Sequence, residues 1–177
     1  MAEHLTLVLG GARSGKSALA ERLARETGRP LTYVATCLPA DDEMRARVEE
    51  HRKRRGAGWR TIEAPRDLPQ AVAGVPDGQV CLIDCLTLWA SNRMAEGADP
   101  DADSRSLLAA LTASGGRLIC VSNEIGMGLV PENAVGRRFR DIQGRLNQAV
   151  AGQADTVVFV AAGLPLTLKG GLPEPWQ

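Results

Sequence analysis

Residues 10–17 read Gly-Gly-Ala-Arg-Ser-Gly-Lys-Ser, and this segment constrains the fold more than any other part of the chain. It satisfies the pattern Gly-x-x-x-x-Gly-Lys-Ser/Thr, in which the backbone N–H groups of a glycine-rich loop surround phosphate oxygens. Lys16 would supply positive charge to the β- and γ-phosphates, and the Ser17 hydroxyl can hold Mg²⁺. The segment therefore predicts a P-loop that binds a nucleoside triphosphate.

The residues on either side support this interpretation over a chance glycine turn. Residues 5–9 form a short apolar run typical of a buried strand. After Lys16, apolar residues recur at helical spacing until Gly28-Arg29-Pro30, which is a helix stop signal. The order strand, loop, helix is the one that the motif requires.

Strands and helices alternate along the rest of the chain. We predict strands at 5–9, 31–35, 80–84, 117–122 and 156–161, with a possible edge strand at 59–63 and a hairpin returning through Gly163 at 165–169. Predicted helices lie at 16–27, 41–55, 86–95, 104–114 and 134–152. The strands are apolar without alternation, as in parallel sheets that are covered on both faces. We expect an α/β, P-loop NTPase-like fold in a single domain over residues 1–169, a surface loop at 96–103 and a flexible tail at 170–177.

Composition narrows the function classes. Lys plus Arg and Asp plus Glu both number 21, so no overall field attracts nucleic acid or an anionic membrane. No apolar stretch approaches the roughly 20 residues of a membrane span, and the first strand begins too early to leave room for a signal peptide. We expect a cytoplasmic protein without nucleic-acid partners or stable membrane insertion. Its four cysteines are expected to be reduced, packed thiols rather than zinc ligands: Cys37, Cys81, Cys85 and Cys120.

Asp84 ends the apolar strand predicted at 80–84 and has two interpretations. In P-loop proteins such a carboxylate commonly completes the Mg²⁺ site. Asp is also favoured as the N-cap of a helix, and a helix is predicted to follow. The pattern leaves both open.

The helix predicted at 41–55 is acidic in its first turn and basic in its last, in agreement with the helix dipole. Met44, Val48, His51 and Arg55 share one face, and arginines crowd around His51. A partly buried histidine on a solvated basic helix is the structural interpretation. The functional one is a ring that neighbouring cations keep neutral and nucleophilic, beside groups that attract nucleotide phosphates.

Taken together, the motifs resemble the bifunctional adenosylcobinamide kinase/adenosylcobinamide-phosphate guanylyltransferase family of cobalamin biosynthesis. The resemblance covers nearly the whole length, from Gly10 to Lys169. Besides the P-loop it includes His51-Arg-x-x-Arg55 and further segments at 35–36, 42–44, 59–63, 84–87, 122–131, 138–141, 144, 147–148 and 154–155.

The resemblance implies two activities. A nucleoside triphosphate, ATP or GTP, phosphorylates the aminopropanol hydroxyl of adenosylcobinamide. GTP then guanylylates His51, and adenosylcobinamide phosphate takes the GMP to give adenosylcobinamide-GDP. Lys16 is the second catalytic residue, and Ser17 and Asp84 are the expected Mg²⁺ ligands. The implied nucleotide-binding residues are Gly10, Gly11, Ala12, Arg13, Ser14, Gly15, Lys16, Ser17, Thr36, Cys37, Arg52, Lys53, Arg54, Arg55, Glu63 and Asp84.

The family also implies a homo-oligomer, a trimer, with active sites near subunit boundaries. Asn123, Glu124, Gly126 and Gly128 are expected near the corrinoid or such a boundary, the other interpretation being a turn with glycines at positive φ. A P-loop kinase without nucleotidyl transfer and a non-enzymatic nucleotide-binding module remain alternatives, whereas a regulatory GTPase would carry an Asn-Lys-x-Asp motif that the chain lacks. Because the α- and γ-phosphorus atoms are several ångströms apart, we expect two nucleotide poses or a movement of the 41–55 helix.

Overall fold

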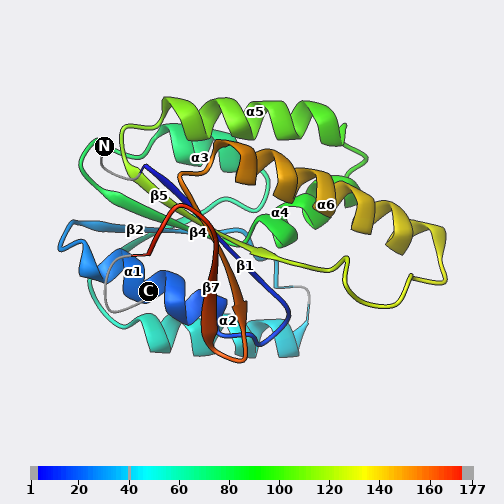
Figure 1. Ribbon diagram of the computed structural model, residues 1–177, viewed down its shortest axis with the longest axis horizontal. Helices are drawn as coiled ribbons and strands as arrows, with labels where there is room; N and C mark the ends of the chain where they lie inside the picture. Colours follow the sequence, from blue (N-terminus) through cyan, green and yellow to red (C-terminus); the bar gives the residue numbers. More distant parts are fainter. Residues whose placement is uncertain (1–3, 40, 173–177) are drawn as a thin grey trace.

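The computed structural model describes residues 4–39 and 41–172 and is built around one seven-stranded sheet (Figure 1). The strand order is β3-β2-β4-β5-β1-β6-β7. Neighbouring strands are parallel except for β7, which pairs antiparallel with β6. The strands are β1 Leu5–Gly10, β2 Leu31–Ala35, β3 Trp59–Glu63, β4 Val80–Asp84, β5 Arg117–Asn123, β6 Thr156–Ala161 and β7 Leu164–Lys169.

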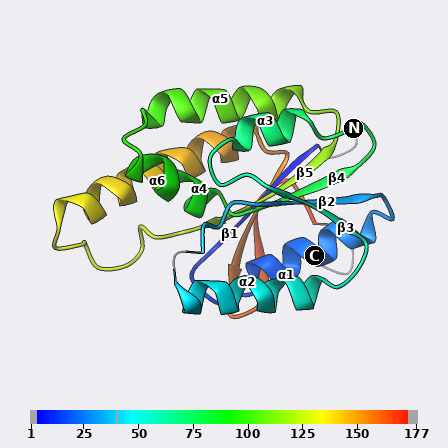
Figure 2. The ribbon, with the colours of Figure 1, turned by 180° about the vertical axis from the view of Figure 1, so that it is seen from behind.

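Helices cover both faces of the sheet, α1 and α2 on one side and the other four on the opposite side (Figures 1 and 2). Successive residues of a central strand therefore pack into different cores: Leu7 into the core beneath α4 to α6, and Val8 into the core beneath α1. Burial on both faces explains why the strands show no polar alternation. The helices are α1 Lys16–Glu26, α2 Asp42–Arg55, α3 Leu68–Ala73, α4 Leu86–Ala95, α5 Pro100–Ala113 and α6 Ala134–Gln153.

The predicted fold class is confirmed, including the edge strand β3 and the C-terminal hairpin of β6 and β7. The hairpin turns through Ala162 and Gly163, both at positive φ. The extent of the tail stays a prediction: residues 173–177 lie outside the described residues, while Leu172 is buried against the core. None of the helices described is long and apolar enough to cross a membrane.

Two predictions about helices were wrong. The expected surface loop at 96–103 is helical from Pro100, because Asp99 caps α5 by accepting the N–H of Asp101 at 3.0 Å and proline suits the first helical position. The six-residue helix α3 was missed, since it is too short to show a hydrophobic period.

The four cysteines are free thiols, as expected. Cys81, Cys85 and Cys120 are buried, whereas Cys37 is only partly so. Burial raises the pKa of Cys81 and of Cys85 to about 12, so both thiols are protonated and poor nucleophiles at neutral pH.

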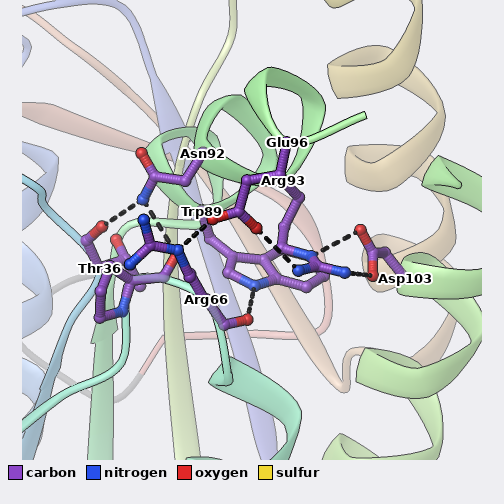
Figure 3. A network of polar contacts seen from close by, with 8 residues as sticks. Thr36, Arg66, Trp89, Asn92, Arg93, Glu96 and Asp103 are labelled. Carbon is purple, nitrogen blue, oxygen red and sulfur yellow. Dashed lines mark hydrogen bonds and ion pairs between the residues drawn. The ribbon is translucent and has the colours of Figure 1, made fainter. Parts of the chain in front are cut away.

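Helix α4 donates hydrogen bonds to the segments that follow the carboxyl ends of β2 and β3 (Figure 3). The side-chain amide of Asn92 donates to the carbonyl oxygen of Thr36 at 2.9 Å and to that of Pro65 at 3.0 Å. One turn earlier, the indole N–H of Trp89 donates to the carbonyl oxygen of Arg66 at 2.8 Å. Two segments that leave the sheet at neighbouring strand ends are thus held by one helix face.

Replacing Asn92 by Ala tests this attachment. The substitution leaves two backbone carbonyls without their donor, and we expect the free energy of unfolding to fall by about 1–3 kcal/mol. Urea denaturation measures it. Arg66→Ala is the matched control in the same segment, because it removes only a half-exposed ion pair with Glu96 and should cost less than about 1 kcal/mol. Equal losses in the two variants would contradict the role given to Asn92.

Candidate active site

The P-loop connects the end of β1 to α1 and passes close to the β6–β7 hairpin. A Cβ atom on Gly10 would lie 2.6 Å from the carbonyl oxygen of Val160, which is too close for any side chain. Gly15 takes φ 96° immediately before α1, a left-handed conformation that favours glycine. The backbone N–H of Gly163 donates to the Ser14 carbonyl at 2.8 Å. The hairpin therefore fixes the loop from outside, and positions 10 and 15 require glycine.

Lys16 and Ser17 open helix α1. Lys16 is only 8% exposed, and its Nζ donates to the carbonyl oxygen of Gly11 at 2.9 Å. A curled loop, a helix N-terminus and an ammonium group together form an arrangement that binds phosphate groups.

A cleft of about 430 Å³ opens between the P-loop and α2, within the size range of ligand sites. His51 faces this cleft from α2, and its side chain is 25% exposed. The helix and loop thus present a nucleophile and a phosphate-binding segment to one space. The lining residues are Arg13, Ser14, Gly15, Lys16, Ser17 and Ala18 from the loop side, and Glu43, Ala46, Glu50, His51 and Arg54 from α2.

Asp84, at the end of β4, lies beside His51 and contacts residues of three other segments: β2, α2 and the P-loop. Its Oδ2 accepts a hydrogen bond from the Tyr33 hydroxyl at 3.2 Å and lies 3.7 Å from Nδ1 of His51. The Ser17 hydroxyl reaches the same carboxylate. The Asp84 side chain is 9% exposed, so these polar groups replace most of its water.

The contacts determine the protonation of Asp84 and Tyr33. Burial alone raises the pKa of Asp84, but the contacts with His51, Tyr33 and Ser17 outweigh it and hold that pKa below its ordinary value. Burial, and after it the Asp84 charge, raises the pKa of Tyr33 well above its ordinary value. At neutral pH the Asp84 carboxylate is therefore ionised and accepts the hydrogen bond that the protonated Tyr33 hydroxyl donates. The N-cap interpretation of Asp84 was wrong, because Cys85 is the N-cap of α4.

Comparison with known proteins decides the family. The model of the cobinamide kinase/cobinamide phosphate guanyltransferase family matches residues 6–168. The chain belongs to this family. It is 48% identical over 168 residues to the bifunctional adenosylcobalamin biosynthesis protein CobP of Pseudomonas aeruginosa, covering 93% of this chain and 96% of that protein. It is 39% identical over 181 residues to CobU of Escherichia coli, covering 93% and 99%.

Solved structures with lower identity show the fold alone. The flagellar accessory protein FlaH from Methanocaldococcus jannaschii superposes with a TM-score of 0.57 at 17% identity, over 96% of this chain and 80% of that one. An ATPase from the type III secretion system of pathogenic bacteria gives a TM-score of 0.55 at 12% identity, over 93% and 56%. The chain is thus a transferase of the cobinamide kinase/guanyltransferase family on a widely used nucleotide-binding fold.

In this family member, the last turn of α2 contacts residues of α1 and β2. The guanidinium of Arg54 pairs with the buried Glu21 of α1 at 2.7 Å. That of Arg55 lies 3.4 Å from the centroid of the Tyr33 ring, and Arg25 donates to the Arg55 carbonyl oxygen. Arg54 and Arg55, which we predicted to bind nucleotide phosphates, therefore contact other residues of the protein.

Several predicted nucleotide-binding residues lie outside the cleft. The Thr36 hydroxyl is buried and hydrogen-bonded to the backbone of Cys85 in both directions, at 2.7 Å. Glu63 ends the edge strand β3, well away from the P-loop. The other predicted residues that do not line the cleft are Cys37, Arg52, Lys53, Arg55 and Asp84, together with Gly10, Gly11 and Ala12 at the start of the P-loop.

The four residues predicted near the corrinoid or a subunit boundary, at positions 123–128, lie in two different places. Asn123 pairs with Gly10 across β5 and β1, and the N–H of Glu124 donates to the Gly10 carbonyl at 3.0 Å, so both adjoin the P-loop. Gly126 and Gly128 continue into a segment that projects beyond the sheet with the first turns of α6 (Figure 1). Neither glycine is among the residues with positive φ, so the turn interpretation does not explain them.

Sequence reasoning missed Tyr33 and Glu21. Tyr33 is the single tyrosine of the chain and lies within a short apolar strand, where an aromatic residue usually indicates core packing. Glu21 lies on the first helix, where a charged residue usually indicates a solvated surface. No local pattern indicates that either one meets a residue of a distant segment.

The residues present fit a Mg²⁺ ion. The Ser17 hydroxyl and the Asp84 carboxylate converge at the mouth of the P-loop, and both offer the oxygen ligands that this ion prefers.

Gly10→Ala tests the close approach of loop and hairpin. The added methyl group must displace the Val160 carbonyl, so we expect the free energy of unfolding to fall by about 1–3 kcal/mol. Gly11→Ala is the matched control, because a Cβ there meets no atom within 4 Å. Thermal or urea unfolding measures both, and a Gly10→Ala variant as stable as Gly11→Ala would refute the argument.

Proposed function

We propose that this chain phosphorylates adenosylcobinamide and then guanylylates the product through a covalent GMP–His51 intermediate. One observation carries the proposal: the P-loop and the imidazole of His51 line the same cleft. A kinase without nucleotidyl transfer would leave this histidine without a covalent role.

In the kinase step, the P-loop amides and Lys16 bind the triphosphate of ATP or GTP and neutralise charge that develops during γ-phosphoryl transfer. The hydroxyl of the aminopropanol arm attacks the γ-phosphorus, and the nucleoside diphosphate leaves. Ser17 and Asp84 would hold Mg²⁺, which when bound supplies positive charge to the phosphate oxygens.

In the guanylyltransferase step, the Nε2 lone pair of His51 forms a bond to the α-phosphorus of GTP, and the bond to the bridging oxygen breaks with release of pyrophosphate. A phosphate oxygen of adenosylcobinamide phosphate then attacks the same phosphorus, and the N–P bond breaks. The histidine regains its lone pair and adenosylcobinamide-GDP leaves. A covalent intermediate divides one difficult transfer into two easier ones.

The two steps use different phosphorus atoms, so we infer that the nucleotide takes two poses or that α2 moves. The contacts described between α2 and the body are concentrated at His51, Arg54 and Arg55, which supports a helix that pivots at its last turn. On this proposal Thr36, Cys37, Arg52, Lys53 and Glu63, which lie outside the cleft, contact the nucleoside or approach it only after such a movement, whereas Arg55 stays at the pivot against Tyr33.

We also propose a cytoplasmic homotrimer with active sites near subunit boundaries. Apolar side chains on the projecting segment support it, since Met127 is 81% and Leu129 is 98% exposed. Val130 and Val135, which precede and open α6, are also exposed, as are three leucines of the edge strand β7, Leu164, Leu166 and Leu168. Exposed apolar groups of this kind are typical of protein interfaces. Asn123, Glu124, Gly126 and Gly128 would then lie between the P-loop and a neighbouring subunit, near the corrinoid.

Labelling with GTP tests the covalent step. Label in the α position should stay on the protein through an acid-labile, alkali-stable bond, because a phosphoramidate has those properties. His51→Ala should abolish the labelling, whereas His4→Ala, a substitution at the other histidine, should leave it unchanged. Label that persists in His51→Ala, or a wild-type protein that is never labelled, would contradict the proposal.

The mass in solution tests the trimer. Light scattering should give three times 18.8 kDa for the wild-type chain. A charge at position 129 would have to be buried in the interface, so Leu129→Asp should shift the population to monomer. A monomeric wild-type protein at micromolar concentration would refute the assembly.

A further inference from the structure

Tyr33 contacts the groups around His51 in two ways. Its hydroxyl donates to Oδ2 of Asp84 at 3.2 Å, and its ring lies beneath the guanidinium of Arg55 at 3.4 Å. The ring also packs against Trp59 in a T-shaped arrangement, with 6.1 Å between centroids. Tyr33 is 5% exposed, so neither its ring nor its hydroxyl is free to reorient.

The ring contact determines the position of α2. Arg55 is one turn beyond His51 on the same helix face, and it is 7% exposed although it carries a charge. A guanidinium over an aromatic face gains energy when it is desolvated, and Arg25 adds a bond to the Arg55 carbonyl. Tyr33 thereby holds the turn of α2 that carries His51.

The hydroxyl contact determines the direction of the carboxylate. Oδ2 of Asp84 is shared between the Tyr33 hydroxyl and Nδ1 of His51, the latter at 3.7 Å. An ionised carboxylate only accepts hydrogen bonds, so a hydrogen bond between Asp84 and this face of the ring requires the proton on Nδ1. Such a contact is often long before the substrate is bound and shortens in the reacting complex.

We propose that Tyr33 is a positioning residue which, through Asp84 and Arg55, holds the neutral His51 ring in the tautomer with its proton on Nδ1 and its Nε2 lone pair toward the cleft. The inference rests on the proposed covalent step. When Nε2 bonds to the α-phosphorus the ring becomes cationic, and the Asp84 carboxylate stabilises that charge until the corrinoid phosphate breaks the N–P bond. Tyr33 itself contacts neither the nucleotide nor the reacting atoms.

Nitrogen NMR of isotopically labelled histidine reads the tautomer directly, at about pH 8.5 where histidine is ordinarily neutral. The chain has only two histidines, and the second is an internal reference. Nε2 of His4 lies 2.9 Å from the Leu111 carbonyl oxygen, which only accepts, so His4 must be the Nε2–H form. We expect His51 to show the opposite form, with assignments from His4→Gln and His51→Gln.

Tyr33→Phe keeps the ring over which Arg55 stacks and removes only the hydroxyl. We expect its His51 nitrogen shifts to move toward a mixture of tautomers while the His4 signals stay in place and show that the fold is intact. In single-turnover labelling, GMP transfer to the protein should slow by about tenfold to a hundredfold, as expected for a lost bond to a charged group. Phosphorylation of adenosylcobinamide should change by less than about threefold, because that step does not use His51 and because Tyr33→Phe leaves the Asp84 carboxylate in place to hold Mg²⁺.

Any of three results would overturn the inference. The first is an Nε2–H tautomer at His51 in the wild-type protein, and the second is an unchanged rate of labelling in Tyr33→Phe. The third is an equal slowing of both reactions in Tyr33→Phe, because that result would assign Tyr33 to the metal site or to stability. Failure of the proposed function has a different signature. A wild-type protein that never takes label refutes the covalent step whatever the tautomer, whereas a labelled protein with an Nε2–H ring refutes only the role of Tyr33.

Discussion

The buried carboxylate of Asp84 is the interaction on which the site depends. It joins β4 to the P-loop through Ser17, to β2 through Tyr33 and to α2 through His51. Without an anion at this point, the Tyr33 hydroxyl and the imidazole would lose the charged partner that orients them. A carboxylate in so little water is tolerated because the groups around it supply hydrogen bonds and compensating charge.

Glycine and backbone contacts provide the second constraint. The P-loop passes so near to the β6–β7 hairpin that Gly10 admits no side chain, and Gly163 in the turn of the same hairpin donates to the Ser14 carbonyl. The antiparallel hairpin thus supports the phosphate-binding segment, a function that its position at the sheet edge does not suggest. On the face of the sheet opposite to α1 and α2 (Figure 1), Asn92 of α4 donates to the segments that follow β2 and β3.

The fold and the chemistry have separate origins. Proteins of 12–17% identity share the sheet and its helices, which shows that the architecture alone does not specify a reaction. What this chain adds beside the P-loop is the helix α2, which carries a histidine facing the cleft and two arginines that contact Glu21 and Tyr33. The sequence suggested that cations around His51 govern its ring, and the structure adds an anion, the Asp84 carboxylate, 3.7 Å from Nδ1 of the imidazole.

The sheet, most of its helices and the P-loop could be predicted from the sequence, because apolar runs, helical periods and a glycine-rich motif are local patterns. His51 and Asp84 could be predicted as separate candidates. The folded structure was needed to show that these two lie together, that Tyr33 contacts Asp84 and that Thr36 and Glu63 lie apart from the cleft. The physical reason is that these contacts connect residues 33, 51 and 84 across different elements, and the burial and partners of a side chain depend on how those elements pack. The P-loop could be predicted because its residues are neighbours in the chain. The contacts around His51 could not be predicted, because they join residues that are neighbours only in space.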